Sequence, residues 1–222
     1  MAASLPLPHY SAHSLKTDEG MAALNKTAPA GKNGKDYNIW IMGDSYVRRG
    51  AQRAAETMGS NLGIQGTRIC WFGWGGLRWR GLLPFFAHSL RGRTAPDVLL
   101  VHCGGNDVGE VSGVKLLNVM KEDLQHLRVQ HPHMKIILSG ITQRCRWKAV
   151  SIPAKIEKSR KFINSVMATF LRTLDGALVE HPHIKHDSPG LFLRDGVHFT
   201  PRGNDIFLTD IAKSLKDHFQ TQ

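Results

Sequence analysis

The chain has 222 residues, of which 41% are hydrophobic and 21% charged, a composition that excludes fibrous and wholly disordered classes of protein. It contains no run of about 18 apolar residues, so a membrane-spanning helix is not expected. Its formal charge is +11, of which residues 1–36 carry only +1. The remaining charge favours an anionic partner such as nucleic acid, a phospholipid surface or an acidic protein, the alternative being a basic surface without a dedicated partner.

Residues 1–36 are rich in Ala, Ser, Pro, Gly and Lys without hydrophobic periodicity, which predicts a disordered tail followed by one folded domain over residues 37–222. In that domain, apolar runs typical of strands alternate with segments of helical periodicity. The predicted strands are Tyr37–Met42, Thr67–Phe72, Pro96–Cys103 and Met134–Ile141. The predicted helices are Ser45–Met58, Val114–Val129, Pro153–Leu174 and Pro201–Phe219. This alternation indicates an α/β fold with a parallel sheet covered by helices on both faces.

Four short fragments contain the residue types of a serine hydrolase, and three of them directly follow predicted strands. They are Gly43-Asp44-Ser45, Gly73-Trp74-Gly75-Gly76, Gly104-Gly105-Asn106-Asp107 and Asp195-Gly196-Val197-His198. Because ligands of such sheets bind at the carboxyl ends of the strands, these fragments are expected to meet at one site.

Ser45 lies where a strand passes into a helix, so its backbone amide is one of the unpaired donors at a helix N-terminus. A serine needs a base to take its proton, and His198, oriented by Asp195 three residues earlier, can supply it. Each fragment also has a structural interpretation: Asp-Ser before a helix is a common N-cap, and Asp195 can simply start a turn.

Oxyanion donors are predicted in the second and third fragments. A glycine there lets its backbone amide approach a substrate, and Asn106 offers a side-chain amide. A glycine-rich turn is the alternative for both.

Taken together, the fragments resemble the blocks of the SGNH (GDSL-type) hydrolases over about residues 37–219, including Asp-Gly-Val-His-Phe-Thr-Pro-Arg-Gly at 195–203. The resemblance implies a three-layer, flavodoxin-like fold with about five strands in the order 2-1-3-4-5. It implies Ser45 as nucleophile, His198 as base and Asp195 as its orienter. It also implies an oxyanion hole formed by the amides of Ser45 and Gly76 and by the side chain of Asn106.

Two positions depart from the family pattern. Trp71 stands where the second block usually begins with Asn, so Gly75 is an alternative to Gly76. Tyr46 adds bulk after the nucleophile. The aromatic residues around the second block are expected to wall a narrow acyl pocket that favours short chains, with core packing as the alternative for Trp71 or Phe72. The predicted substrate-pocket residues are Asp44, Tyr46, Trp74, Trp79 and Val197.

A narrower similarity concerns Gly75–Trp79, Asp97–Asn106 and Ile141–Trp147, which resemble the esterase domain of first-open-reading-frame proteins of vertebrate LINE retrotransposons. This similarity implies a truncated or domesticated descendant of such a protein.

Other features admit a second interpretation. Two echoing segments, Gln130–Lys135 and Glu180–Lys185, each contain a His-Pro-His that could bind a metal, although helix termination explains them without one. Cys103 is a rival nucleophile, disfavoured because it still lies within its predicted strand. The three cysteines are expected to be reduced, as in a cytosolic protein. The segment 144–161 has seven Lys or Arg against one acidic residue, and a second basic group comprises Arg78, Arg80, Arg91 and Arg93. Either group could contact phosphates or be a solvated surface.

The sequence therefore predicts a serine esterase that acts on short-chain acyl esters or a lipid-like ester, with no metal or cofactor. The alternative is a module of retrotransposon origin that binds nucleic acid or anionic membranes and has weak esterase activity. A secreted carbohydrate acetyl esterase is disfavoured because the N-terminus lacks the pattern of a signal peptide. A cytoplasmic location with access to the nucleus is expected.

Overall fold

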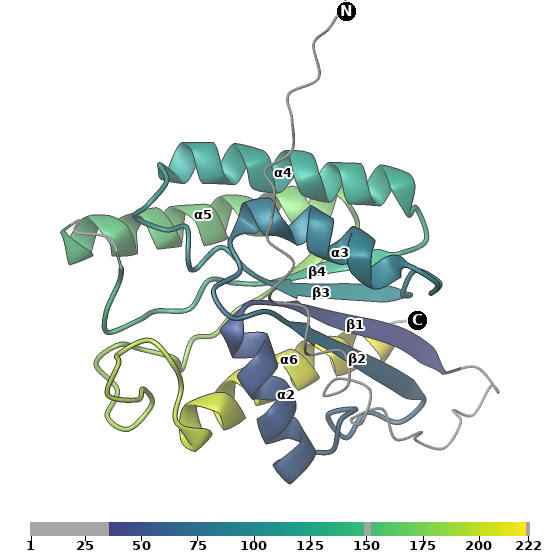
Figure 1. The fold of residues 1–222 in the computed structure, drawn as a ribbon, viewed down its shortest axis with the longest axis horizontal. Coiled ribbons are helices and arrows are strands. Elements are labelled where there is room, and N and C mark those ends of the chain that lie inside the picture. Colours follow the sequence, from purple (N-terminus) through teal and green to yellow (C-terminus); the bar gives the residue numbers. More distant parts are fainter. Residues whose placement is uncertain (1–35, 149–151, 221–222) are drawn as a thin grey trace, which may run out of the picture.

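The computed structural model describes residues 36–148 and 152–220. Five parallel strands form one sheet in the order β2-β1-β3-β4-β5, which confirms the fold class and strand order (Figure 1). The strands are β1 (Tyr37–Gly43), β2 (Thr67–Gly73), β3 (Val98–His102), β4 (Lys135–Ser139) and β5 (Ala177–Val179).

Helices cover both faces of the sheet and make three layers (Figure 1). One face is covered by α2 (Ser45–Thr57) and α6 (Pro201–Gln220). The other is covered by α3 (Leu82–Leu90), α4 (Gly113–Gln130) and α5 (Pro153–Thr173), with the short 3₁₀ turn η3 (Trp79–Gly81) leading into α3. Among the described residues, no helix is long and apolar enough to cross a membrane.

Side-chain alternation along the central strands divides the core into two layers. On β1, Trp40 and Met42 pack toward the layer of α3, α4 and α5, whereas Ile39 and Ile41 pack toward α2 and α6. Both sets are almost completely buried. A strand covered on both faces needs this continuous apolar run, which explains why β1 and β3 were recognisable from the sequence.

The register of the sheet brings three of the four fragments to one edge. Gly43, the last residue of β1, pairs with Gly73 at the end of β2 and with His102 at the end of β3. Because parallel strands all point the same way, the segments that leave these three strand ends begin side by side.

Besides the turn η3, one strand and one helix were not predicted from the sequence pattern. β5 has only three residues, too few to show a period, and α3 is a mostly apolar segment without the polar face that marks a surface helix. The predicted tail lies outside the described residues, apart from Asp36.

Candidate active site

Ser45 is the first residue of α2, and Asp44 is its N-cap. The Oδ1 of Asp44 accepts a hydrogen bond from the amide of Tyr46 at 3.0 Å. The amide of Ser45 precedes that capped amide at the positive end of the helix dipole. Negative charge that develops next to Ser45 is therefore stabilised by the start of α2.

Ser45, His198 and Asp195 form a hydrogen-bonded chain. The Oγ of Ser45 lies 3.1 Å from Nε2 of His198, and Nδ1 of His198 lies 2.6 Å from Oδ2 of Asp195. The residues come from opposite ends of the domain, since Ser45 begins α2 and the other two occupy the loop before α6. The three side chains named from the sequence are thus in contact in the order that proton transfer requires.

The loop itself holds Asp195 in an ionised form. Its Oδ1 accepts hydrogen bonds from the amides of Val197 and His198, each at 2.9 Å. Burial opposes ionisation, but the His198 side chain and these two amides outweigh it and lower the pKa of Asp195 to about 2. A carboxylate in this state accepts a proton-bearing Nδ1 and so leaves Nε2 of His198 free to face Ser45.

Asn106 connects the second and third fragments. Its Nδ2 donates to the carbonyl of Leu77 at 3.0 Å and lies 3.4 Å from Oδ2 of Asp44. Leu77 closes a turn by donating its amide to the carbonyl of Trp74 at 3.1 Å. The side-chain amide of Asn106 therefore lies between the glycine turn and the start of α2.

The turn from Trp74 to Leu77 leaves the amides of its two central residues, Gly75 and Gly76, outside its own hydrogen bond. Gly76 has a φ of +76°, a left-handed conformation that favours glycine, and a Cβ placed there would meet no atom within 4 Å. Space for a substrate atom is thus available beside Gly76. Gly75 differs in that its Cβ position lies 3.9 Å from Nη2 of Arg48.

Two of the predicted pocket residues lie beneath Ser45, not on a pocket wall. Asp44 and Tyr46 are 0% and 1% exposed. Burial raises the pKa of Asp44 to about 6 against the opposing charge of Arg144, and it raises the pKa of Tyr46 to about 12. The hydroxyl of Tyr46 donates a hydrogen bond to the carbonyl of Val197 in the His198 loop. Tyr46 therefore supports the site from below. The sequence predicted that it would add bulk beside the nucleophile, and its burial corrects that prediction. Val197 itself is partly exposed.

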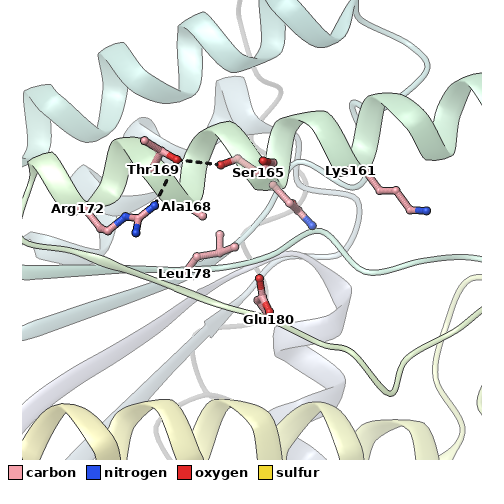
Figure 2. Close-up of a pocket in the computed structure, with 8 residues that line it drawn as sticks. Lys161, Ser165, Ala168, Thr169, Arg172, Leu178 and Glu180 are labelled. Carbon is pink, nitrogen blue, oxygen red and sulfur yellow. Dashed lines mark hydrogen bonds between the residues drawn. The ribbon is translucent and has the colours of Figure 1, made fainter.

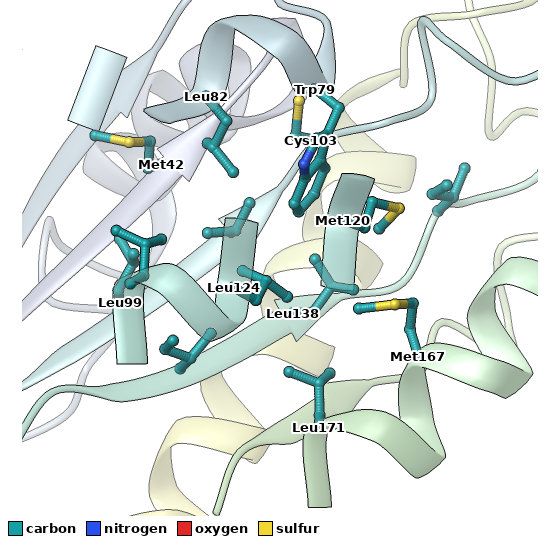
Figure 3. Packing of buried hydrophobic residues seen from close by; sticks show 14 of the residues in the cluster. Met42, Trp79, Leu82, Leu99, Cys103, Met120, Leu124, Leu138, Met167 and Leu171 are labelled. Atoms are coloured by element: carbon teal, nitrogen blue, oxygen red, sulfur yellow. The ribbon is translucent and has the colours of Figure 1, made fainter. Parts of the chain in front are cut away.

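The predicted aromatic wall is also corrected in part. Trp79 is 1% exposed among core residues (Figure 3), and its indole N–H donates to Oδ2 of Asp123 at 2.9 Å. Phe72 packs in the same core layer, and Trp71 packs partly buried on the other side of the sheet. Trp74, by contrast, is 50% exposed and rests edge-on against Phe85. Of the four aromatic residues, Trp74 is the one that presents a large apolar surface beside the site.

Arg144 is a site residue that the sequence did not identify. The basic segment 144–161 was interpreted as a phosphate contact or a solvated surface, but the Arg144 side chain is 3% exposed. Its Nη1 donates to Oδ1 of Asn106 at 3.2 Å, and its Nη2 lies 3.7 Å from Oδ2 of Asp44. The available signal was its place just after a predicted buried strand, which charge counting concealed.

The histidines and cysteines that the sequence offered as other candidates take no part in the Ser45 site. His181, one of the echoing histidines, uses both ring nitrogens, bonding Asp210 at 2.9 Å and Ser139 at 2.8 Å. Within residues 36–148 and 152–220, no cluster of three His, Cys, Asp or Glu is arranged to hold a metal ion. The three cysteines are free thiols. Cys103 is fully buried, and burial raises the pKa of its thiol well above the usual range.

A groove of about 340 Å³ lies between α5 and the end of β5 (Figure 2). It shares no residue with the Ser45 site. Most of the residues that line it have polar side chains, and the full lining comprises Lys161, Asn164, Ser165, Ala168, Thr169, Arg172, Leu178 and Glu180.

Comparison with known proteins places the chain in a family. The GDSL-like lipase/acylhydrolase family model matches residues 38–206. No curated protein sequence matches the chain.

Solved structures share the fold at low sequence identity. A GDSL-like lipase from Bacteroides thetaiotaomicron is 17% identical, with a TM-score of 0.64 over 91% of this chain and 96% of its own. A member of the lipolytic protein G-D-S-L family from Veillonella parvula is 12% identical, with a TM-score of 0.63 over 79% and 96%. A carbohydrate esterase family 3 protein from Talaromyces cellulolyticus is 15% identical, with a TM-score of 0.59 over 84% and 99%. Since the family model spans most of the folded chain, this protein belongs to the GDSL-like lipase/acylhydrolase family and is a carboxylic ester hydrolase.

Proposed function

We propose that this protein is a serine esterase that hydrolyses short-chain acyl esters through an acyl-enzyme, with Ser45 as nucleophile. The observation that carries the proposal is the chain from Ser45 Oγ to His198 Nε2 at 3.1 Å and from His198 Nδ1 to Asp195 at 2.6 Å. These hydrogen bonds end at Ser45, at the N-terminus of a helix, where an oxyanion is stabilised.

In the proposed reaction, Ser45 Oγ attacks the ester carbonyl while His198 Nε2 takes the hydroxyl proton. The oxyanion of the tetrahedral intermediate accepts hydrogen bonds from the amides of Ser45 and Gly76 and from Nδ2 of Asn106, which gives up its longer contact with Asp44 at 3.4 Å. The intermediate collapses as His198 protonates the leaving alkoxide, and the alcohol departs. A water molecule then attacks the acyl group, again giving its proton to His198, and the carboxylic acid leaves as Ser45 regains its proton.

The preference for short acyl chains rests on where the free space lies. The side chains of Asp44, Tyr46 and Trp79 are buried, so they do not line an open space for an acyl chain. Among the exposed large hydrophobic residues, two lie in the segments that form the site: Trp74, at 50% exposure, and Leu193 of the His198 loop, at 38%. A methyl group can rest against Trp74, whereas the distal part of a long chain stays in water and gains little of the ~0.8 kcal/mol available per buried methylene.

The test is hydrolysis of p-nitrophenyl acetate, butyrate and octanoate by the wild type and by Ser45→Ala, together with labelling by a fluorophosphonate probe. We expect labelling and turnover that depend on Ser45, with kcat/KM highest for acetate or butyrate. Turnover that persists in Ser45→Ala would remove the proposed mechanism. A kcat/KM that rises steeply to octanoate would leave the mechanism in place and contradict the short-chain preference.

Four further expectations stay predictions: one domain over residues 37–222, an origin in a retrotransposon, an anionic partner and a cytoplasmic location.

Several arginines near the site edge are exposed, among them Arg48, Arg78 and Arg80, and they support electrostatic attraction of anionic ligands. A salt-dependent shift of single-stranded RNA or of anionic vesicles by Ser45→Ala would identify such binding separately from hydrolysis.

A further inference from the structure

A single buried guanidinium lies at the centre of the residues that flank the nucleophile. Arg144 donates to Asn106 Oδ1 at 3.2 Å and approaches Asp44 Oδ2 at 3.7 Å. Its guanidinium carbon lies 5.2 Å from the centre of the Tyr46 ring. Asp44 and Tyr46 are the neighbours of Ser45 in sequence, and Asn106 is the proposed side-chain oxyanion donor. One cation therefore contacts all three supports of the proposed reaction centre.

The contacts of Asn106 with Arg144 and with Leu77 together determine how its side-chain amide is oriented. A guanidinium has only donors, so the Asn106 atom that faces Arg144 has to be the oxygen. On the opposite side, the Leu77 carbonyl can only accept, so the atom that faces it, at 3.0 Å, has to be the nitrogen. Without Arg144, Oδ1 of Asn106 loses its donor and the amide is held from one side only.

The position of Arg144 is built into the third fragment. A Cβ at Gly105 would lie 2.4 Å from Nη2 and 3.0 Å from Cζ of Arg144, so the guanidinium packs directly on the Gly105 backbone. On another side, its carbon lies 5.3 Å from the centre of the Trp147 ring. The Gly-Asn pair thus provides both the oxyanion amide and the space for the cation that orients it.

The same segment also contacts the loop of the base. The amide of Arg146 donates to the carbonyl of Gly196 at 2.9 Å, between Asp195 and His198 in sequence. Buried charges of this kind are tolerated when they are paired and hydrogen-bonded, as Arg144 is by Asp44 and Asn106.

From these contacts we propose that Arg144 is a positioning residue, which presents the Nδ2 of Asn106 to the oxyanion and fixes Asp44 at the start of the nucleophile helix. This inference rests on the proposed esterase function. Arg144 acts through Asn106, so its effect should fall on the chemical step more than on substrate binding.

Kinetics provide the first test, with p-nitrophenyl acetate as substrate. Arg144→Met should lower kcat by about 10²-fold, as expected for loss of an oriented oxyanion donor, with KM changed less than about threefold. Arg144→Lys keeps the charge without the planar fork and should recover only part of the rate. In an Asn106→Ala background, Arg144→Met should cause a smaller loss than in the wild type, because one of the two groups that it positions is already gone.

Arg160→Met is the matched control. Arg160 is also a buried arginine, but it donates to the Ile141 carbonyl at 2.7 Å and pairs with Glu157 at 2.6 Å, and it contacts none of the proposed site residues. The Arg160→Met variant should have a lower free energy of unfolding and an unchanged kcat. If Arg144→Met does not fold, Gly105→Ala serves instead, since its methyl group displaces the guanidinium while leaving the charge in the protein.

A second measurement is independent of hydrolysis. The side-chain amide resonances of Asn106, assigned by their loss in Asn106→Ala, should shift and exchange faster with water in Arg144→Lys and Gly105→Ala. If they do so while the wild type shows no Ser45-dependent turnover, positioning stands and the esterase function fails. Unchanged resonances, or losses of kcat that add fully with Asn106→Ala, would overturn the role of Arg144.

Discussion

The hydroxyl of Tyr46 donates a hydrogen bond to the backbone carbonyl of Val197, joining residues 151 positions apart. Tyr46 follows the proposed nucleophile, and Val197 precedes the proposed base. The ring of Tyr46 also packs against Phe199 with centroids 4.5 Å apart. One buried side chain therefore links the helix that begins at Ser45 to the loop that carries His198.

Tyr46→Phe removes this link without removing the ring. Loss of the donor to a partly buried carbonyl should lower the free energy of unfolding by about 1–3 kcal/mol. Because the His198 loop is then free to shift, kcat should fall by about 10- to 100-fold. Urea denaturation and initial rates on p-nitrophenyl acetate measure the two effects. A loss of stability with kcat intact would mean that the link holds the fold and not the geometry of the reaction.

Asp195→Asn should lower kcat by about 10²- to 10⁴-fold, because the amide no longer stabilises the imidazolium or selects the His198 tautomer. The pKa of Asp195 is about 2, so the carboxylate is ionised throughout an assay between pH 5 and pH 9. Protonation of Asp195 therefore should not cause an acid limb in the wild-type profile. Asp187→Asn, in an exposed aspartate of the same loop, is the control and should leave the rate unchanged.

Because of His102, the free energy of unfolding should decrease as the pH is lowered below neutrality. Burial, together with the charges of His181 and Arg144, lowers the pKa of His102 well below 6.5. Below about pH 6.5 the unfolded chain takes up a proton that the folded protein resists, so the free energy of unfolding decreases as pH falls.

His102→Gln removes this proton uptake. The difference in unfolding free energy between pH 7.5 and pH 5.0, measured by urea denaturation, should be smaller than in the wild type. His88→Gln, at an exposed histidine, should keep the wild-type difference. An equal pH dependence in all three proteins would show that His102 is not the group responsible.

The two tryptophans that follow β2 should separate function from stability. Trp74→Ala should raise KM for p-nitrophenyl butyrate and change the free energy of unfolding by less than about 0.5 kcal/mol, because Trp74 is half-exposed. Trp79→Phe should leave KM unchanged but lower the free energy of unfolding by about 1–3 kcal/mol, since it removes volume from the core and the donor to Asp123. The reverse pattern would return Trp79 to the pocket wall.

The sequence by itself determined the α/β class and the convergence of the fragments. Apolar runs covered on both faces mark β1 and β3, and parallel strands share one carboxyl edge, so Ser45 and Asn106 were expected at that edge before any contact was known. The resemblance to a known family added the strand order. The pairing of Asp195 with His198 followed from their spacing in one loop.

Only the tertiary structure decided which side chains are covered, because burial depends on residues distant in sequence. Trp74 and Trp79 are similar in the sequence, yet α4 covers only Trp79, through Asp123. Arg144 looked like one more surface charge until the fold placed it between Asp44 and Asn106. A count of charges or aromatic residues does not show which side chains touch each other. Those contacts arise only when α2, β3 and the segment after β4 pack together.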